Sequence, residues 1–377
     1  GGPPVGKVRP MDSAPTLTDD VVTLRAHRED DVQGCFEQCQ DPVSQEWTTV
    51  PVPYSMENAR SFVTEVMPQG WAAGTSWGFA VEVDGRYAGT VELRDEGEGR
   101  LEVAYGSHPW VRGTGSMERA VRLLVDWAFD DRAARVVIWR ANTGNWASRK
   151  LAWRLGFTIE GTIRAALPQR GELRDAWVGT LLPTDTREPK GRWLDVPVLE
   201  ADGLRLRSWR DSDAPRIVEA CTDPRTRQWL PLLPDPYGEA EARSWLEAQL
   251  ESRATGRSAC WAVVDPADEA RVLASISYFD YTPEIECEIG FWSHPDARGR
   301  GVATRAMREV VRYTFEDLGV RRVSAAAAVD NAASRHVIEA NGLTTWGTER
   351  LGIDVHAGRA DLAWYDLLVE EWRRLGR

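Results

Sequence analysis

Two copies of the sequence His-Pro-x-x-Arg-Gly-x-Gly lie in this chain of 377 residues, at His108–Gly115 and at His294–Gly301. The second copy follows the first by 186 positions (294 − 108 = 186), and this offset holds without a gap as far as Asp175 and Asp361. A chance motif would not keep register over so long a stretch. A repeat close to half the chain length predicts a duplicated domain rather than a solenoid of short repeats.

The segments before the motif also match between the copies, at a slightly smaller offset. Cys39 and Cys221 are separated by 182 positions (221 − 39 = 182), so small insertions lie in loops, where they are best tolerated. Thr184–Pro197 is polar, contains two prolines and separates the copies, as a linker would. We therefore expect a flexible N-terminus at 1–16, a first domain at 17–183, a linker at 184–197 and a second domain at 198–377.

Hydrophobic periodicity predicts an α/β fold for each copy, with α+β mixed layers. The expected order is strand, helix, helix, three meandering strands, helix, strand, helix and strand. The motif lies between the third meander strand and a long amphipathic helix, and Asp84-Gly85 is typical of a two-residue hairpin. In the first copy we expect central strands at 77–83, 87–94, 101–107 and 136–139 and helices at 116–129 and 147–155. In the second copy we expect strands at 259–264, 272–278, 286–293 and 323–327 and helices at 302–315 and 334–340.

Composition excludes several classes of function. The net charge of −12 and the pI near 5.1 argue against nucleic acid as a partner and mildly favour a cationic or amine substrate. No apolar stretch approaches the ~18 residues of a membrane span, and the start of the chain lacks the apolar core of a signal peptide, so we expect a cytoplasmic protein that does not bind membranes. The five cysteines show no metal-ligand spacing, so we expect free thiols and no metal site.

The glycine turn predicts an anion site. A strand that runs into Arg-Gly-x-Gly and then a helix leaves several backbone N–H groups pointing at one spot, which suits a phosphate or pyrophosphate. Arg112, Arg298 and Arg300 could add charge-assisted hydrogen bonds to the same anion. The chain has no P-loop sequence, and the glycines come too late in each domain for a dinucleotide-binding fold.

A second repeated motif follows, Asn145-x-x-Ser148 and Asn331-x-x-Ser334. With the strand at Glu288–Trp292 and the turn at Arg298–Ala303, it resembles the GNAT superfamily of acyl-CoA-dependent N-acyltransferases, of the RimJ/RimL-like branch, over nearly the whole chain. The resemblance implies two tandem GNAT-like domains, each with a central mixed, mostly antiparallel sheet flanked by helices. It implies acetyl-CoA as the cofactor, held in the second copy by Phe291, Trp292, Arg298, Gly299, Arg300, Gly301, Val302, Ala303 and Asn331. The equivalent residues of the first copy are Arg112, Gly113, Thr114, Gly115, Ser116, Met117 and Asn145.

Acyl transfer to an amine needs a base for the ammonium proton and an acid for the departing thiolate. Glu102 and Glu288 hold equivalent places on the strand beside the acyl site, and Glu288 is the preferred base, with Glu286 in reserve. The family's usual tyrosine acid is absent, since Ala152 and Ile338 occupy its position. In the RimJ/RimL-like pattern serine can take this role, which assigns it to Ser148 and Ser334. Capping of the helix start alone would also explain Ser334, and it is the alternative for Asn145 and Asn331, where it can coexist with a cofactor contact.

The copies differ after the second glycine, where the first has Ser116-Met117 and the second the usual Val302-Ala303. The second domain is therefore the expected catalyst. The acceptor is expected to be a primary amine of a small metabolite or antibiotic, or a peptide N-terminus, and Trp292 is a candidate wall of its pocket. A non-catalytic acyl-CoA sensor or scaffold and a transferase using another acyl-CoA stay open, as do a monomer with an internal pseudo-dimer and a homodimer.

Overall fold

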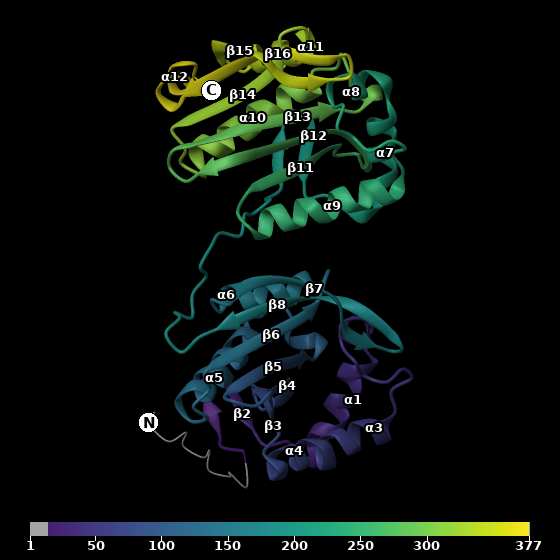
Figure 1. The fold of residues 1–377 in the computed structure, drawn as a ribbon, viewed down its shortest axis with the longest axis vertical. Coiled ribbons are helices and arrows are strands. Elements are labelled where there is room, and N and C mark those ends of the chain that lie inside the picture. Colours follow the sequence, from purple (N-terminus) through teal and green to yellow (C-terminus); the bar gives the residue numbers. More distant parts are fainter. Residues whose placement is uncertain (1–13, 377) are drawn as a thin grey trace. The chain divides into compact units, whose positions relative to one another are not determined.

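The computed structural model describes residues 14–376, and the chain divides after Lys190 into two units (Figure 1). The flexible segment expected at 1–16 lies mostly outside the described residues. Residues of the expected linker contact both units. Lys190 donates to Thr158 of the first unit, whereas the N–H of Leu194 donates to the carbonyl of Arg253 in the second.

The first domain contains one eight-stranded sheet in the order β1-β2-β3-β4-β5-β6-β8-β7. All neighbouring strands are antiparallel except β5 and β6, which are parallel. The strands are β1 (Leu17–Thr18), β2 (Val22–Arg25), β3 (Ser76–Val83), β4 (Arg86–Asp95), β5 (Arg100–Ser107), β6 (Val136–Asn142), β7 (Thr158–Gln169) and β8 (Glu172–Leu181). The α-helices are α1 (Val32–Gln40), α2 (Pro42–Trp47), α3 (Met56–Ser61), α4 (Met67–Ala73), α5 (Ser116–Asp130) and α6 (Trp146–Arg154).

The second domain repeats this topology in the order β9-β10-β11-β12-β13-β14-β16-β15, with β13 and β14 as the parallel pair. Its strands are β9 (Leu199–Ala201), β10 (Leu204–Arg207), β11 (Ser258–Asp265), β12 (Asp268–Thr282), β13 (Glu286–Ser293), β14 (Arg322–Ala328), β15 (Thr344–Val355) and β16 (Gly358–Leu368). Its α-helices are α7 (Ala214–Thr222), α8 (Pro224–Trp229), α9 (Glu239–Ala254), α10 (Val302–Glu316), α11 (Ala332–Ala340) and α12 (Val369–Arg374).

The predicted mixed α/β fold is confirmed, and the central strands and helices agree with the prediction to within a few residues. The sequence-based prediction of one closing strand per domain is wrong, because the last two strands of each domain form a hairpin, β7/β8 or β15/β16. Register shifts within both hairpins break the alternation of apolar and polar residues that identifies a strand. The prediction also missed the short strands β1 and β9, which are too brief to show a period. The expected two helices before the meander are likewise wrong, because α1 to α4 precede it in the first domain and α7 to α9 in the second.

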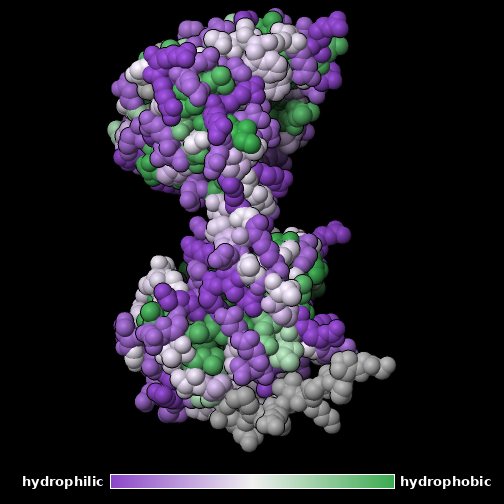
Figure 2. Space-filling model, turned by 90° about the vertical axis from the view of Figure 1, so that its left-hand side faces the viewer, coloured by the Kyte–Doolittle hydropathy of each residue, from purple (hydrophilic) through white to green (hydrophobic). Residues whose placement is uncertain are grey.

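Each core lies between the sheet and its long helix, α5 or α10. Both helices carry apolar residues at three- and four-residue spacing, and these side chains pack against the sheet beside Trp139 in the first domain and Trp261 in the second. Hydrophilic residues cover most of the face of each domain seen in Figure 2, with apolar residues in small groups. Over the described range, 14–376, we find no helix with the length and hydropathy needed to span a bilayer.

The parallel strands of each domain pair only at their starts and then separate. In the second domain the pairing runs from Glu286 with Arg322 to Glu288 with Ser324, although both strands continue for several residues. In the first domain the last pair is Val103 with Trp139. Each sheet therefore contains a fork between its two parallel strands. Beyond the last pair, the described backbone of each of these strands has no hydrogen bond to the other, and we call these segments the unpaired arms.

Candidate active site

The glycine turn lies between the fork and the long helix of each domain. Gly299 and Gly301 have φ of 72° and 68°, in the left-handed region that favours glycine, and a Cβ at either position would meet no atom within 4 Å. Gly113 and Gly115 have the same conformation and the same open surroundings. The turn therefore leaves a surface that a ligand can approach closely.

The start of α10 has the free backbone donors that an anion requires. Gly301 is the N-cap of α10, and no side chain caps the helix. Within the described part of the chain, no hydrogen bond engages the N–H groups of Gly301, Val302 and Ala303. The helix dipole adds partial positive charge at the same point, so the turn suits a phosphate group.

The equivalent turn of the first domain is less suited to an anion. The N–H of Ser116 donates to the hydroxyl of Thr114, and the two hydroxyl oxygens lie 2.8 Å apart. The first turn of α5 also contains Glu118, where α10 has Thr304. The carboxylate of Glu118 lies 3.7 Å from Arg122 and 3.7 Å from Arg154. The first turn therefore retains the backbone shape, but one of its N–H groups is already engaged.

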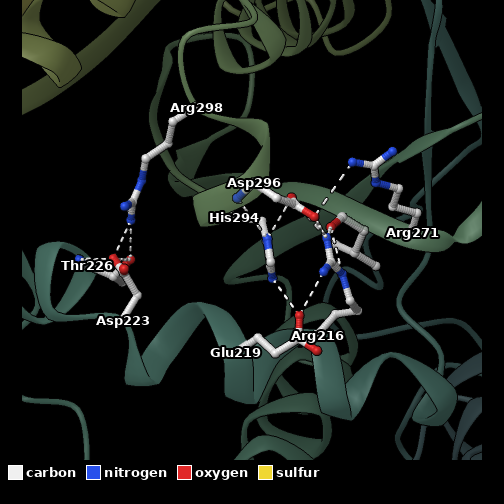
Figure 3. A network of polar contacts seen from close by, with 9 residues as sticks. Arg216, Glu219, Asp223, Thr226, Arg271, His294, Asp296 and Arg298 are labelled. Atoms are coloured by element: carbon white, nitrogen blue, oxygen red, sulfur yellow. Dashed lines mark hydrogen bonds and ion pairs between the residues drawn. The ribbon is translucent and has the colours of Figure 1, made fainter.

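Arg298 is held by the N-terminus of α8 (Figure 3). Its guanidinium lies 2.6 Å from the carboxylate of Asp223 and 2.8 Å from the hydroxyl of Thr226. Burial alone would raise the pKa of Asp223, but hydrogen bonds from Arg298 and from the N–H of Thr226 hold it below its ordinary value. Arg112 makes the same contact with Asp41, at 2.7 Å. Both arginines, predicted as phosphate ligands, thus connect the glycine turn to a helix, whereas Arg300 is exposed.

The histidine of the repeated motif reinforces this connection. His294 is buried, with one ring nitrogen 3.0 Å from Glu219 of α7 and the other 2.7 Å from Asp296, which in turn pairs with Arg216 (Figure 3). In the first domain His108 lies 3.2 Å from Glu37 of α1. The histidines therefore connect the start of each turn to a helix.

Alternation along β13 divides the predicted residues between the two faces of the sheet. Phe291 packs with the core beneath α10, whereas Glu288 and Trp292 lie on the opposite face, where Trp292 packs against Trp209 at a ring distance of 6.0 Å. Helix α11, which carries Ser334, packs on α10. Glu288 and Ser334 therefore lie on opposite sides of the sheet, with the fork between them.

Glu288 is located where β13 and β14 separate, and it lines a cavity of about 260 Å³. Among the described residues no cation lies within ion-pair distance of its carboxylate. Burial, and to a lesser extent the charge of Asp280, raise the pKa of Glu288 to about 7. The neighbouring Glu286 is different, because it pairs with Arg322 at 2.8 Å. Glu288 is thus the carboxylate able to exchange a proton near neutral pH.

Glu102, the equivalent of Glu288, is neutralised. Arg140 of β6 lies 3.2 Å from its carboxylate, and Arg94 lies 4.0 Å away. The second domain has Ala326 in the place of Arg140. Glu102 is therefore a paired carboxylate, with Arg140 and Arg94 near it, whereas Glu288 has neither.

The serines differ in the same way. The hydroxyl of Ser148 lies 2.7 Å from that of Tyr105 and accepts a hydrogen bond of 3.1 Å from the indole of Trp139. In the second domain Phe291 and Ala325 replace Tyr105 and Trp139, and no hydrogen bond to the hydroxyl of Ser334 is found among the described residues.

The two asparagines cap the helices that follow them. The side-chain oxygen of Asn145 accepts from the N–H of Ser148 at 3.1 Å, and Asn331 makes the same bond to Ser334 at 3.2 Å. The expected capping role is confirmed for both. Any contact with a cofactor would be an additional role.

The cavity beside Glu288 also contains residues that sequence reasoning missed. Its walls are formed by Asp280, Glu286, Cys287, Glu288, Arg322, Ser324, Trp346 and Trp364. Trp346 and Trp364 come from the closing hairpin β15/β16, and Trp292, the tryptophan predicted for this pocket, is not part of the lining. Both tryptophans are visible in the sequence, but only the strand register brings them beside the fork.

Comparison with known proteins assigns the family. The model of the acetyltransferase (GNAT) domain matches residues 22–158 and 203–344, which together form more than half of the chain. The chain therefore belongs to the GNAT family of acetyl-CoA-dependent acetyltransferases, and it carries the family domain twice.

The relatives match single domains of the chain. YdaF of Bacillus subtilis (strain 168), which carries the provisional name of a ribosomal N-acetyltransferase, is 40% identical over 87 residues, which are 23% of this chain and 48% of YdaF. The match thus spans about half the length of that relative. YnaD of the same organism, an uncharacterized N-acetyltransferase, is 23% identical over 45% of this chain and 95% of its own. A solved GCN5-related N-acetyltransferase from Brucella melitensis is 25% identical, with a TM-score of 0.43, over 48% of this chain and 83% of its own.

Proposed function

We propose that the second domain transfers an acetyl group from acetyl-CoA to a primary amine, and that the first domain does not catalyse this reaction. The observation that carries the proposal is the state of the two equivalent glutamates. Glu288 has no ion-pair partner among the described residues and lies at the fork beside a cavity, whereas Glu102 is neutralised by Arg140.

The residues present fit acetyl-CoA in the second domain. Open glycines and uncapped N–H groups suit the pyrophosphate, and the unpaired strand arms suit the amide groups of the pantetheine chain. The residues that would hold the cofactor are Phe291, Gly299, Arg300, Gly301, Val302, Ala303 and Asn331. Arg298 would act through the position of the turn, because Asp223 and Thr226 already bind its guanidinium.

Glu288 would act as the base. A free alkylamine has a pKa near 10, so only roughly 0.1% of it is neutral at pH 7 without help. With a pKa of about 7, Glu288 is substantially ionised near neutral pH and can accept the ammonium proton. The cavity beside it gives the amine access to the fork.

Ser334 would assist the departure of the thiolate from the other side of the sheet. Bound acetyl-CoA supplies an activated thioester carbonyl, and the thiolate that leaves needs a proton. The hydroxyl of Ser334 is not engaged by Phe291 or Ala325, which have no polar side-chain atom to offer it. It is therefore available to donate a hydrogen bond to the departing sulfur.

The first domain differs from the second at these features. Its fork holds the cluster of Tyr105, Ser148 and Trp139, where the second domain has Phe291, Ser334 and Ala325. The N–H of Ser116 at its glycine turn is also already bonded to Thr114. Its closing hairpin is held by two side-chain hydrogen bonds, because Gln169 donates to the carbonyl oxygens of Glu46 and Thr48 at 2.7 and 3.0 Å. In the second domain a backbone hydrogen bond from His356 to Gln228, at 3.0 Å, joins the hairpin to α8. These contacts support a structural role for this domain.

Calorimetry of the full chain with acetyl-CoA, combined with detection of free thiol in the presence of amines, tests the proposal. We expect one site per chain and thiol release with an accepted amine. Gly301→Glu should abolish binding by placing bulk and negative charge in the turn, whereas the matched Gly115→Glu should leave binding and turnover unchanged, although both glycines have positive φ. Two equal sites, or loss of binding with Gly115→Glu alone, would contradict the assignment of the domains.

A further inference from the structure

The cavity beside Glu288 has a distinct chemical character. It presents three carboxylates, from Asp280, Glu286 and Glu288, and one guanidinium, from Arg322. Arg322 is already paired with Glu286 at 2.8 Å and with Asp366 at 3.0 Å. Its charge is therefore balanced within the protein, and the remaining negative charge faces the cavity.

Two tryptophans form an aromatic wall in the same cavity. The rings of Trp346 and Trp364 lie 6.2 Å apart with an interplanar angle of 32°, and Trp346 is largely exposed. The guanidinium of Arg322 lies 5.8 Å from the Trp346 ring, so this aromatic face already accepts a cation. The first domain has Glu160 and Val178 at these positions and lacks the wall.

Asp280 lines the cavity and has an unusual backbone conformation. Its φ is 48°, in the left-handed region, and it lies at a register shift between β12 and β13. Aspartate tolerates this conformation better than most residues, and such strain often occurs at ligand sites. The side chain is exposed and has no ion-pair partner among the described residues. An unpaired carboxylate thus borders the cavity close to Glu288.

We infer that the acceptor is a small amine with a second cationic group, which Asp280 and the Trp346–Trp364 wall bind while the reacting nitrogen lies at Glu288. This inference rests on the proposed function, because it assigns the substrate class of the same cavity. An amine with a single charge would leave the carboxylate of Asp280 without a partner. A substrate with an acidic group beside the amine would be repelled by it.

The test compares a linear alkyl diamine with the alkyl monoamine of equal carbon number, by thiol release from acetyl-CoA with the full chain. We expect kcat/KM for the diamine to be greater by about tenfold, as one charge-assisted hydrogen bond at a partly exposed site would give. Asp280→Asn keeps a residue that tolerates positive φ and should remove this preference, mainly through KM for the diamine. Trp346→Leu, at an exposed position, should weaken it further.

Glu284→Gln is the matched control. Glu284 also has a positive φ, 59°, and follows Asp280 closely in the chain, but it does not line the cavity. This variant should keep the preference. If thiol is released but Asp280→Asn selects between the amines as the wild type does, the inference is wrong and the proposed function stands. If no amine of either kind releases thiol, the proposed function itself is contradicted.

Discussion

The two domains share a backbone and differ at the fork. Both have the same strand order, the same glycine turn with positive φ and the same arginine bound to a helix N-terminus. The differences are in side chains on the parallel strands, where the first domain has Arg140, Trp139 and Tyr105. The second domain has Ala326, Ala325 and Phe291 at these positions. The comparison teaches that the motif preserves a shape, whereas the chemistry depends on a few positions that the motif does not include.

The strongest test of this difference is removal of each glutamate. Glu288→Gln should lower kcat for amine acetylation by roughly 10²–10⁴-fold, the usual contribution of a general base. The matched Glu102→Gln should leave kcat unchanged, because Glu102 is already occupied by Arg140. Steady-state thiol release measures both. In the wild type the rate should rise with pH through about 7, since only ionised Glu288 accepts a proton.

A loss of activity in both variants would show that both domains turn over. If the Glu288→Gln variant were as active as the wild type, Glu288 would not be the base. Calorimetry of acetyl-CoA binding to the Glu288→Gln variant provides the control. Its affinity for acetyl-CoA should equal that of the wild type, because the glycine turn is unaltered.

The second test concerns the cluster that fills the first fork. Trp139 is 1% exposed and contacts both Tyr105 and Ser148, so Trp139→Ala should destabilise the first domain by about 3–5 kcal/mol. Hydrogen exchange followed by mass spectrometry should show faster exchange in 100–142 and little change in the second domain. Acetylation at 25 °C should continue. If the Trp139→Ala variant lost acetylation while its hydrogen exchange stayed unchanged, the fork of the first domain would have a role in turnover.

Much of this architecture could be read from the sequence. The duplication, the fork strands and the long helices were all visible, because an ungapped repeat and helical periodicity report on backbone structure. The pairing of Arg298 with Asp223 could not be predicted from the sequence. The two residues are 75 positions apart, and only the packing of α8 on the turn brings them together. The same limit applies to Trp346 and Trp364, whose register depends on irregularities in the final hairpin.

A smaller effect is expected from the serines. Ser334→Ala should lower kcat by about tenfold, as the loss of one hydrogen bond to a developing charge would, with little change in KM for acetyl-CoA. Ser148→Ala should leave kcat unchanged, because that hydroxyl is bonded to Tyr105 and Trp139. Single-turnover measurements separate this step from product release. A rise in KM without loss of kcat would assign Ser334 to cofactor binding.

The smallest effect is on stability, and its sign distinguishes a free carboxylate from a paired one. The pKa of Glu288 is about 7 in the folded protein against 4.5 for an unperturbed glutamate, so the folded state binds the proton more tightly. Ionisation therefore costs stability as pH rises from about 4.5 through 7. Glu288→Gln should stabilise the second domain at pH 8 by about 1–2 kcal/mol, after allowance for solvent screening, and hardly at all at pH 4.5. Glu102→Gln should not stabilise the first domain at either pH, because it removes one partner of Arg140. Thermal unfolding of both variants at pH 4.5 and pH 8 measures the difference between them.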